Sequence, residues 1–139
     1  MAFLFDTDAI SEVLRRRPLP AYLRWLETIP RVEQFTSAVV IGELYKGAYR
    51  SAEVDRHVEQ IGARVLPALT VLPYDTAVAR MYGAIDAKLH RMRLPLADAD
   101  LQIAATALHH GLELVTGNIR HFERIPGLSL ARALADARR

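Results

Sequence analysis

Cysteine is absent from this sequence of 139 residues. Its absence excludes disulfide frameworks, thiolate zinc sites and cysteine nucleophiles, and it suits a reducing compartment. Long apolar runs are absent too: the opening Met1–Asp6 has no basic leader, and its apolar stretch is far shorter than the roughly 18 residues of a membrane span. We therefore expect a soluble, cytoplasmic protein without a signal peptide or a membrane segment.

Lysine is scarce, since Lys46 and Lys88 are the only two among 18 lysines and arginines. The planar guanidinium group of arginine matches phosphate geometry. Three groups of arginines are therefore candidates for contact with a nucleic-acid backbone: Arg15–Arg17, Arg91 with Arg93, and Arg120 with Arg124. A surface arginine is more often only solvated, and an arginine excess can reflect a GC-rich genome, so charge alone leaves both interpretations open.

The length fits one domain, and the balance of 51% hydrophobic and 24% charged residues is that of a globular protein with a core. Short apolar runs predict strands over residues 3–5, 35–37, 71–74 and 112–115, with a last short strand at 129–130. Helical patterns cover about residues 9–16, 21–28, 38–50, 52–65, 77–92 and 98–111, followed by a ragged C-terminal helix. This alternation predicts an α/β fold: one domain over residues 1–139 with a parallel sheet of four to five strands flanked by helices.

Three acidic residues lie where a site is expected. Asp6 directly follows the first predicted strand, and ligands of parallel sheets bind beyond the carboxyl ends of the strands. Glu43 and Asp100 each fall on the apolar face of a predicted helix, where an unpaired carboxylate is costly. Alternatives stay open: Asp6 as a helix N-cap, Glu43 in a structural salt bridge or on a helix rolled toward solvent, and Asp100 as a first-turn acid stabilised by the helix dipole.

A cluster of these three carboxylates would be destabilised by mutual repulsion unless a cation held it. Oxygen ligands without histidine or cysteine favour Mg²⁺, or Mn²⁺, over zinc. Such ions bind phosphate oxygens and activate water, which is the chemistry of phosphodiester hydrolysis. The acids and the arginines together therefore point to a metal-dependent nuclease.

Four segments and the tail resemble the motifs of one family, the VapC-type PIN-domain toxins. They occur in the family order and span nearly the whole chain: Phe3–Asp8, Thr36–Gly47, Asp98–Ala107, Gly111–Asn118 and Phe122–Leu128. Each motif is weakly specific alone, but the set is quite specific. The resemblance implies a PIN-like fold and a toxin of a type II toxin–antitoxin pair.

The resemblance also implies a Mg²⁺-dependent endoribonuclease that cuts a structured RNA such as transfer or ribosomal RNA. Asp6, Glu43 and Asp100 match the residues that hold the metal and position water, and Thr7 and Thr116 match polar positions beside them. It further implies a homodimer, or a higher toxin–antitoxin assembly, and a VapB-like antitoxin whose C-terminal segment lies across the site.

The sequence departs from the family pattern in two places. A fourth acid is common after the last motif strand, but Asn118 and His121 occupy the candidate positions here; Asn118 can offer a carbonyl oxygen to a metal or hold a metal-bound water. Asp8 stands where asparagine is usual, either as an extra carboxylate or, as we favour, as a cap of the first helix. Asp98 is a further candidate for a ligand or a supporting residue, with helix capping as the alternative.

Other functions compete with the toxin interpretation. A PIN-like nuclease of RNA processing would need no antitoxin, and a catalytically degenerate PIN domain would only bind RNA or a partner. A phosphatase of the haloacid-dehalogenase type would use Asp6 as a covalent nucleophile, but it needs a downstream lysine near the site, and Lys88 lies inside a predicted helix. The five histidines have no metal-ligand spacing and the aromatic residues follow core spacing, so we assign neither group a role in catalysis or base stacking.

Overall fold

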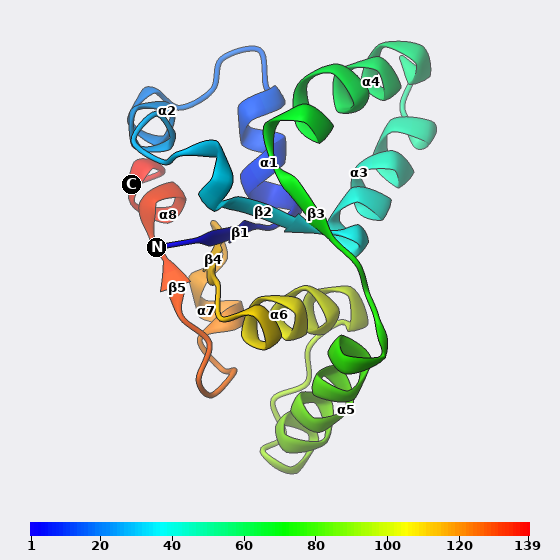
Figure 1. Cartoon of the computed structure of the whole chain (residues 1–139), viewed down its shortest axis with the longest axis vertical. Coiled ribbons are helices and arrows are strands. Elements are labelled where there is room, and N and C mark those ends of the chain that lie inside the picture. The colour runs from blue at the N-terminus through cyan, green and yellow to red at the C-terminus, as the bar shows by residue number, and fades with distance from the viewer.

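Five short parallel strands form one sheet in the computed structural model, which describes residues 1–139. The strands are β1 (Phe3–Phe5), β2 (Gln34–Ser37), β3 (Thr70–Leu72), β4 (Glu113–Val115) and β5 (Leu130–Ala131), in the order β3-β2-β1-β4-β5. Figure 1 shows this sheet between two groups of helices. The predicted α/β fold with a parallel sheet of four to five strands is therefore confirmed.

Eight α-helices and three short helical turns lie between and after the strands. They are α1 (Thr7–Leu14), α2 (Pro20–Leu26), η1 (Arg31–Glu33), α3 (Ala38–Arg50), α4 (Val54–Gln60), the π-helical turn η2 (Ile61–Val65), η3 (Leu66–Ala68), α5 (Thr76–Arg91), α6 (Asp98–His110), α7 (Ile119–Phe122) and α8 (Ala133–Ala137). In Figure 1, α1 and α2 lie above the central strands, and α5 and α6 lie below them. None of these helices is both long enough and apolar enough to span a bilayer.

The order of the strands places a switch point beside β1. The chain proceeds from β1 to β2 and β3 on one side, then returns to the other side with β4 and β5. Phe5 at the end of β1 pairs with Val115 at the end of β4. Crevices of open parallel sheets lie at such a switch point, beyond the carboxyl ends of the strands. The next residues along the chain, Asp6 and Thr116, stand at this position.

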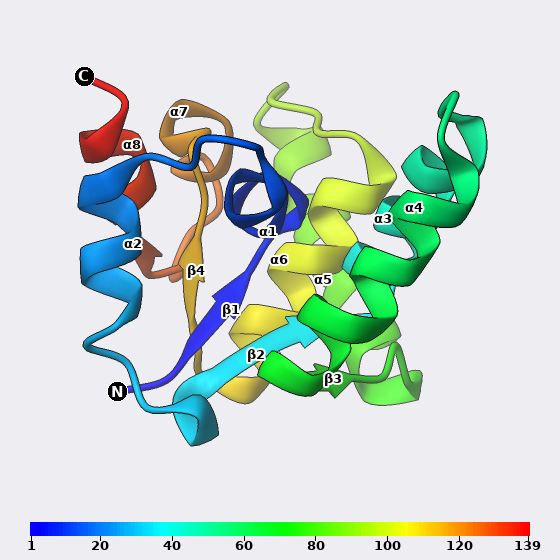
Figure 2. The same cartoon turned by 90° about the horizontal axis from the view of Figure 1, so that it is seen from above.

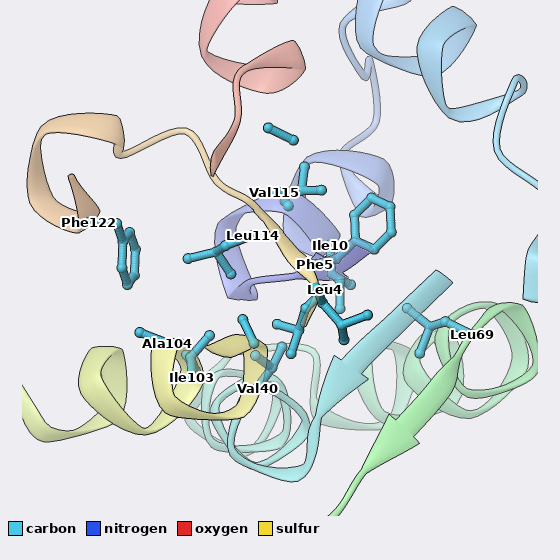
Figure 3. Packing of buried hydrophobic residues seen from close by; sticks show 14 of the residues in the cluster. Leu4, Phe5, Ile10, Val40, Leu69, Ile103, Ala104, Leu114, Val115 and Phe122 are labelled. Atoms are coloured by element: carbon cyan, nitrogen blue, oxygen red, sulfur yellow. The ribbon is translucent and has the colours of Figure 1, made fainter. Parts of the chain in front are cut away.

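The core covers both faces of the sheet, as expected for parallel strands with apolar sequences. Leu4 and Leu114, at the centres of β1 and β4, are fully buried. Figure 3 shows Phe5 and Val115 on one side of the central strands and Ile103 of α6 on the other. This two-sided burial holds the carboxyl ends of β1 and β4 in fixed positions.

Two helices from near the beginning and the end of the chain, α2 and α8, pack against each other at the β5 edge of the sheet. Helix α8 lies beside α2 there, while α3 and α4 lie at the opposite edge (Figure 2). Tyr22 of α2 is completely buried, and its hydroxyl donates a hydrogen bond of 3.0 Å to the backbone oxygen of Ala9 in α1. The C-terminal residues are thereby brought close to the beginning of the chain.

Candidate active site

Asp6 is the buried acid at the centre of the site, with 6% of its surface exposed. Its backbone N–H continues the pairing of β1 with β4 by donating to the Val115 oxygen at 3.1 Å. Its side chain is the N-cap of α1, because Oδ1 accepts a hydrogen bond of 2.8 Å from the N–H of Ala9. The capping alternative for Asp6 is therefore correct, and it leaves the carboxyl group at the switch point of the sheet. It also explains why α1 begins at Thr7, two residues earlier than expected.

Burial raises the pKa of Asp6 to about 7. Hydrogen bonds from Thr116 and from the N–H of Ala9 oppose this rise, whereas the charges of Asp8 and Asp100 add to it. A carboxyl group that is desolvated and faces two other acids is costly to ionise. A positive charge placed beside Asp6 would remove that cost.

Glu43 enters the site through a contact with the residue that follows Asp6. The Thr7 hydroxyl donates a short hydrogen bond to Oε1 of Glu43 and so links α1 to α3. Glu43 is half-buried, whereas its neighbours Val40 and Leu44 are buried. The predicted core-facing orientation is therefore only partly correct: Glu43 lies at the edge of the apolar face of α3, where a carboxylate keeps access to solvent.

Asp100 lies in the first turn of α6 and is in contact with a histidine from the segment after β4. Its Oδ2 is 2.8 Å from Nε2 of His121, and about a third of each side chain is exposed. Asp100 also acts electrostatically on Asp6. The spacing of the histidines along the sequence does not indicate this contact. It joins residues 21 positions apart and depends on the fold.

Thr116 and Asn118 follow β4, but they face the site differently. Thr116 is fully buried, its hydroxyl oxygen accepts a hydrogen bond of 3.0 Å from the N–H of Asn118, and its side chain lowers the pKa of Asp6. Asn118 is exposed and stands at the N-terminus of α7 without a side-chain capping bond. Its backbone supports the site through Thr116, and the ligand role of its side-chain oxygen stays a prediction.

Asp8 does not cap the first helix, contrary to our preferred interpretation, because Asp6 already does so. Its carboxylate instead forms a two-pronged ion pair with Arg138, at 2.7 and 3.0 Å. The same guanidinium contacts the fully buried Glu12 at 3.1 Å. A Cβ atom on Gly117 would meet the ends of the Arg138 and Asp8 side chains, so a larger residue there would force this ion pair to shift. The structure thus places an arginine beside the acids that no sequence motif had indicated.

Asp98 does not cap α6, and its carboxylate contacts α5 instead. The N-cap of α6 is Ala97, and no side chain caps this helix, so the capping alternative is wrong. Asp98 is exposed and accepts a hydrogen bond of 2.9 Å from the Tyr82 hydroxyl of α5. Its oxygens therefore hold α5 against α6, and its role as a metal ligand stays a prediction.

The acids share one end of the sheet, but their side chains are not gathered into a ready cage. No three histidine, aspartate or glutamate side chains lie close enough together to hold a metal ion as they stand. Each carboxylate has its own partner, namely Ala9 for Asp6, Thr7 for Glu43 and His121 for Asp100. Repulsion between uncompensated carboxylates favours this separation. The donor set, with its carboxylate and hydroxyl oxygens, nevertheless fits a hard divalent cation.

Comparisons of this chain with known proteins agree on one family. The family model of the PIN domain matches residues 3–128. Ribonuclease VapC2 of Haemophilus influenzae is 33% identical over 128 residues, which cover 92% of this chain and 95% of that protein. The tRNA(fMet)-specific endonuclease VapC of Salmonella typhimurium is 32% identical over 130 residues, which cover 94% and 96% of the two chains.

Solved structures agree with the sequence relatives. A chain of the DNA-bound VapBC complex from Salmonella typhimurium superposes with a TM-score of 0.86 at 31% identity, covering 94% of this chain and 97% of that one. FitAcB from Neisseria gonorrhoeae gives a TM-score of 0.85 at 28% identity, covering 93% and 96%. These matches remove the haloacid-dehalogenase alternative. The chain belongs to the PIN-domain family and is of the VapC type.

Proposed function

We propose that this protein is a divalent-metal-dependent endoribonuclease, the toxin of a type II toxin–antitoxin pair, and that it hydrolyses phosphodiester bonds of structured RNA such as transfer or ribosomal RNA. The observation that carries the proposal is the buried Asp6 at the β1–β4 switch point, whose pKa is raised by burial and by its acidic neighbours. A carboxyl group that is costly to ionise does not stabilise the fold, so its presence at this position is better explained by a function. The ribonuclease and endonuclease names of the relatives support RNA as the substrate.

Asp6, Glu43 and Asp100 are the residues that we propose to hold the cation. A bound Mg²⁺ or Mn²⁺ would supply positive charge to phosphate oxygens and to an attacking water. Asp6 is held rigidly by the Ala9 N–H and the end of the sheet, so it provides the fixed oxygen of the set. Glu43 and Asp100 are half-buried, and their side chains can turn toward Asp6 when the repulsion between the carboxylates is removed.

The neighbouring polar residues orient these acids. Thr7 donates to Glu43, and Thr116 acts on the pKa of Asp6; we propose that both threonines support the acids. His121 contacts Asp100 and is the candidate to position that carboxylate, at one of the two positions where the family resemblance implies a fourth acid. A histidine here gives one negative charge fewer, which favours one tightly held ion over two.

Cleavage of RNA by the purified protein tests this proposal. We expect cutting of total transfer or ribosomal RNA in Mg²⁺ or Mn²⁺, loss of cutting in EDTA, and loss of at least a hundredfold in rate for Asp6→Asn. The control Asp86→Asn changes an exposed acid of α5 and should cut normally. The products should carry 5′-phosphate and 3′-hydroxyl ends, because water rather than the ribose hydroxyl attacks. Cyclic phosphate ends, or cutting that persists in EDTA, would contradict the proposal.

We further propose a VapB-like antitoxin as the partner and a homodimer as the assembly. The structures similar to this chain include VapBC complexes from Salmonella typhimurium and Rickettsia felis, both bound to DNA. An antitoxin gene is expected to adjoin or overlap the upstream end of the toxin gene. Co-expression of the two products should give one complex on size-exclusion chromatography and should suppress RNA cutting. Separate elution with undiminished cutting would favour the RNA-processing alternative.

A further inference from the structure

A groove with a volume of about 500 Å³ runs between α1, α3 and α4 and opens beside the acids. Thr7 and Glu43 form its end next to Asp6, and Gly47 and Ser51 continue along its α3 wall. The volume is within the roughly 300–1,000 Å³ range of ligand sites. In Figure 1, α1, α3 and α4 lie together above the end of the sheet. The groove is therefore continuous with the proposed catalytic centre.

Three arginines line this groove: Arg15 and Arg16 after α1, and Arg56 of α4. Arg16 is exposed and has no ion-pair partner. Arg56 pairs with Glu53 at 2.8 Å, but both side chains are more than half exposed, and such surface pairs contribute little. Both guanidinium groups are therefore available to an anion. Glu43 at one end and the arginines along the walls match a phosphodiester strand that leads to the proposed centre.

The rest of the lining favours a nucleic acid over a protein segment. Only four of the fourteen lining residues are hydrophobic, whereas an amphipathic helix would need an apolar channel. Ser11, Ser51 and Gln60 supply hydroxyl and amide groups that suit ribose and phosphate oxygens. No phenylalanine, tyrosine or tryptophan lines the groove, and the imidazole of His57 is the one ring that could meet a base.

We propose that this groove binds the RNA backbone next to the cleaved bond, with Arg16 and Arg56 contacting phosphates. The inference rests on the proposed ribonuclease function and adds the substrate-binding residues to it. Among the three groups of arginines suggested by the sequence, it selects the one that includes Arg15–Arg17. Because its contacts are to phosphate and ribose, the groove contributes affinity and register without reading the sequence.

Gly47 offers a way to block the groove without changing any charge. It is exposed on α3, and a Cβ atom there would meet nothing within 4 Å. A larger side chain at this position projects into the groove, and it also favours the helix, because glycine is a poor helix former. Gly42 has the same free space, lies about 140° around the helix from Gly47, and is not in the lining. Gly42→Gln is thus the matched control for Gly47→Gln.

The test measures binding of a fluorescein-labelled pool of total transfer RNA to the full chain carrying Asp6→Asn, so that no cutting occurs. In this background, Arg16→Gln and Arg56→Gln should each weaken binding about three- to tenfold, and each should reduce the slope of log K against log salt by about 0.7–0.9. Arg24→Gln, which removes an exposed arginine of α2 far from the groove, should change neither quantity.

Gly47→Gln should weaken RNA binding about tenfold while melting at or above the temperature of its parent, and Gly42→Gln should bind normally. Unchanged RNA binding by Gly47→Gln and both arginine variants would overturn the inference. The groove would then be better explained as a binding site for a protein partner. An equal loss in Arg24→Gln would also overturn it. Failure of the proposed ribonuclease function is distinguishable from failure of this inference, because the unsubstituted protein would then show no metal-dependent cutting of RNA.

Discussion

Glu12 is the most completely buried charged side chain of the molecule, with 1% of its surface exposed. Burial alone would raise its pKa, but hydrogen bonds from Arg138, from the N–H of Leu19 and from Arg15 hold the pKa below its ordinary value. Removal of a partner from a buried charged group is costly, because the remaining groups lose their compensation. Glu12 therefore stabilises the join between α1, the loop before α2 and the C-terminal segment.

Replacement of Glu12 by glutamine should lower the free energy of unfolding by about 1–3 kcal/mol at pH 7. A carboxyl group with a lowered pKa in the folded state contributes stability above its unfolded pKa, and that stability is lost as the pH falls. The difference between the two proteins should therefore shrink below the ordinary value of 4.5. Urea denaturation of both proteins between pH 3 and pH 8 measures it, and a difference independent of pH would contradict the ionic role.

Helix α1 organises the site at the scale of elements. It begins at the Asp6 cap, carries Thr7 and Asp8 in its first turn, and forms one wall of the arginine-lined groove. Helix α8 is tied to it by Arg138, although 130 residues separate Asp8 from Arg138 in the sequence. The carboxylate at position 8 thus has its own neutralising cation in this chain.

A double-mutant cycle on Asp8 and Arg138 should reveal this compensation. Arg138→Gln alone should destabilise the protein because it exposes the Asp8 charge to Asp6 and leaves Glu12 with fewer partners. In the Asp8→Asn background the same change should cost less, with a coupling of about 0.5–1 kcal/mol for a partly exposed pair. Thermal melts at low salt measure the cycle. Additive effects would show that Arg138 acts on Glu12 alone.

The elements differ in how far the sequence predicts them. The sequence predicts strands β1 and β4 and the long helices α3 and α6 to within about two residues. Burial on both sheet faces appears in the sequence as a short apolar run, and a helix appears as apolar residues at helical spacing. Helix α7 was missed since its four residues are too few to show a period. The region 52–65, expected as one helix, is α4 followed by a π-helical turn, a change of hydrogen-bonding pattern that side-chain polarity does not encode.

At the scale of the whole molecule, the sequence indicates candidate acids but not their partners. Asp6, Glu43 and Asp100 are candidates because each is an acid in an unusual position, and their joint role stays a prediction. Their partners depend on how distant segments meet, so neither His121 beside Asp100 nor Arg138 beside Asp8 had a local signal. The separation of the three carboxylates was likewise not predictable, because it follows from side-chain conformations that mutual repulsion selects.

Binding of a divalent cation should stabilise the entire fold if the three carboxylates share it. A ligand that binds only the folded state adds about 2.7 kcal/mol at a concentration one hundred times its dissociation constant. Mn²⁺ or Mg²⁺ should therefore raise the melting temperature of the protein, and Asp100→Asn should greatly reduce the increase. The control Asp86→Asn should respond as the unsubstituted chain does. An equal increase in all three proteins would indicate binding elsewhere.

The double use of the Asp6 carboxyl group, as helix cap and as site acid, has a genetic consequence. In a selection for cells that survive expression of the protein, escape alleles at codon 6 should fall into two classes. Asparagine and serine keep a capping oxygen and should yield harmless protein at normal abundance, whereas alanine or lysine also lose the start of the first helix and should be cleared by proteases. Immunoblots of the survivors would separate the two classes.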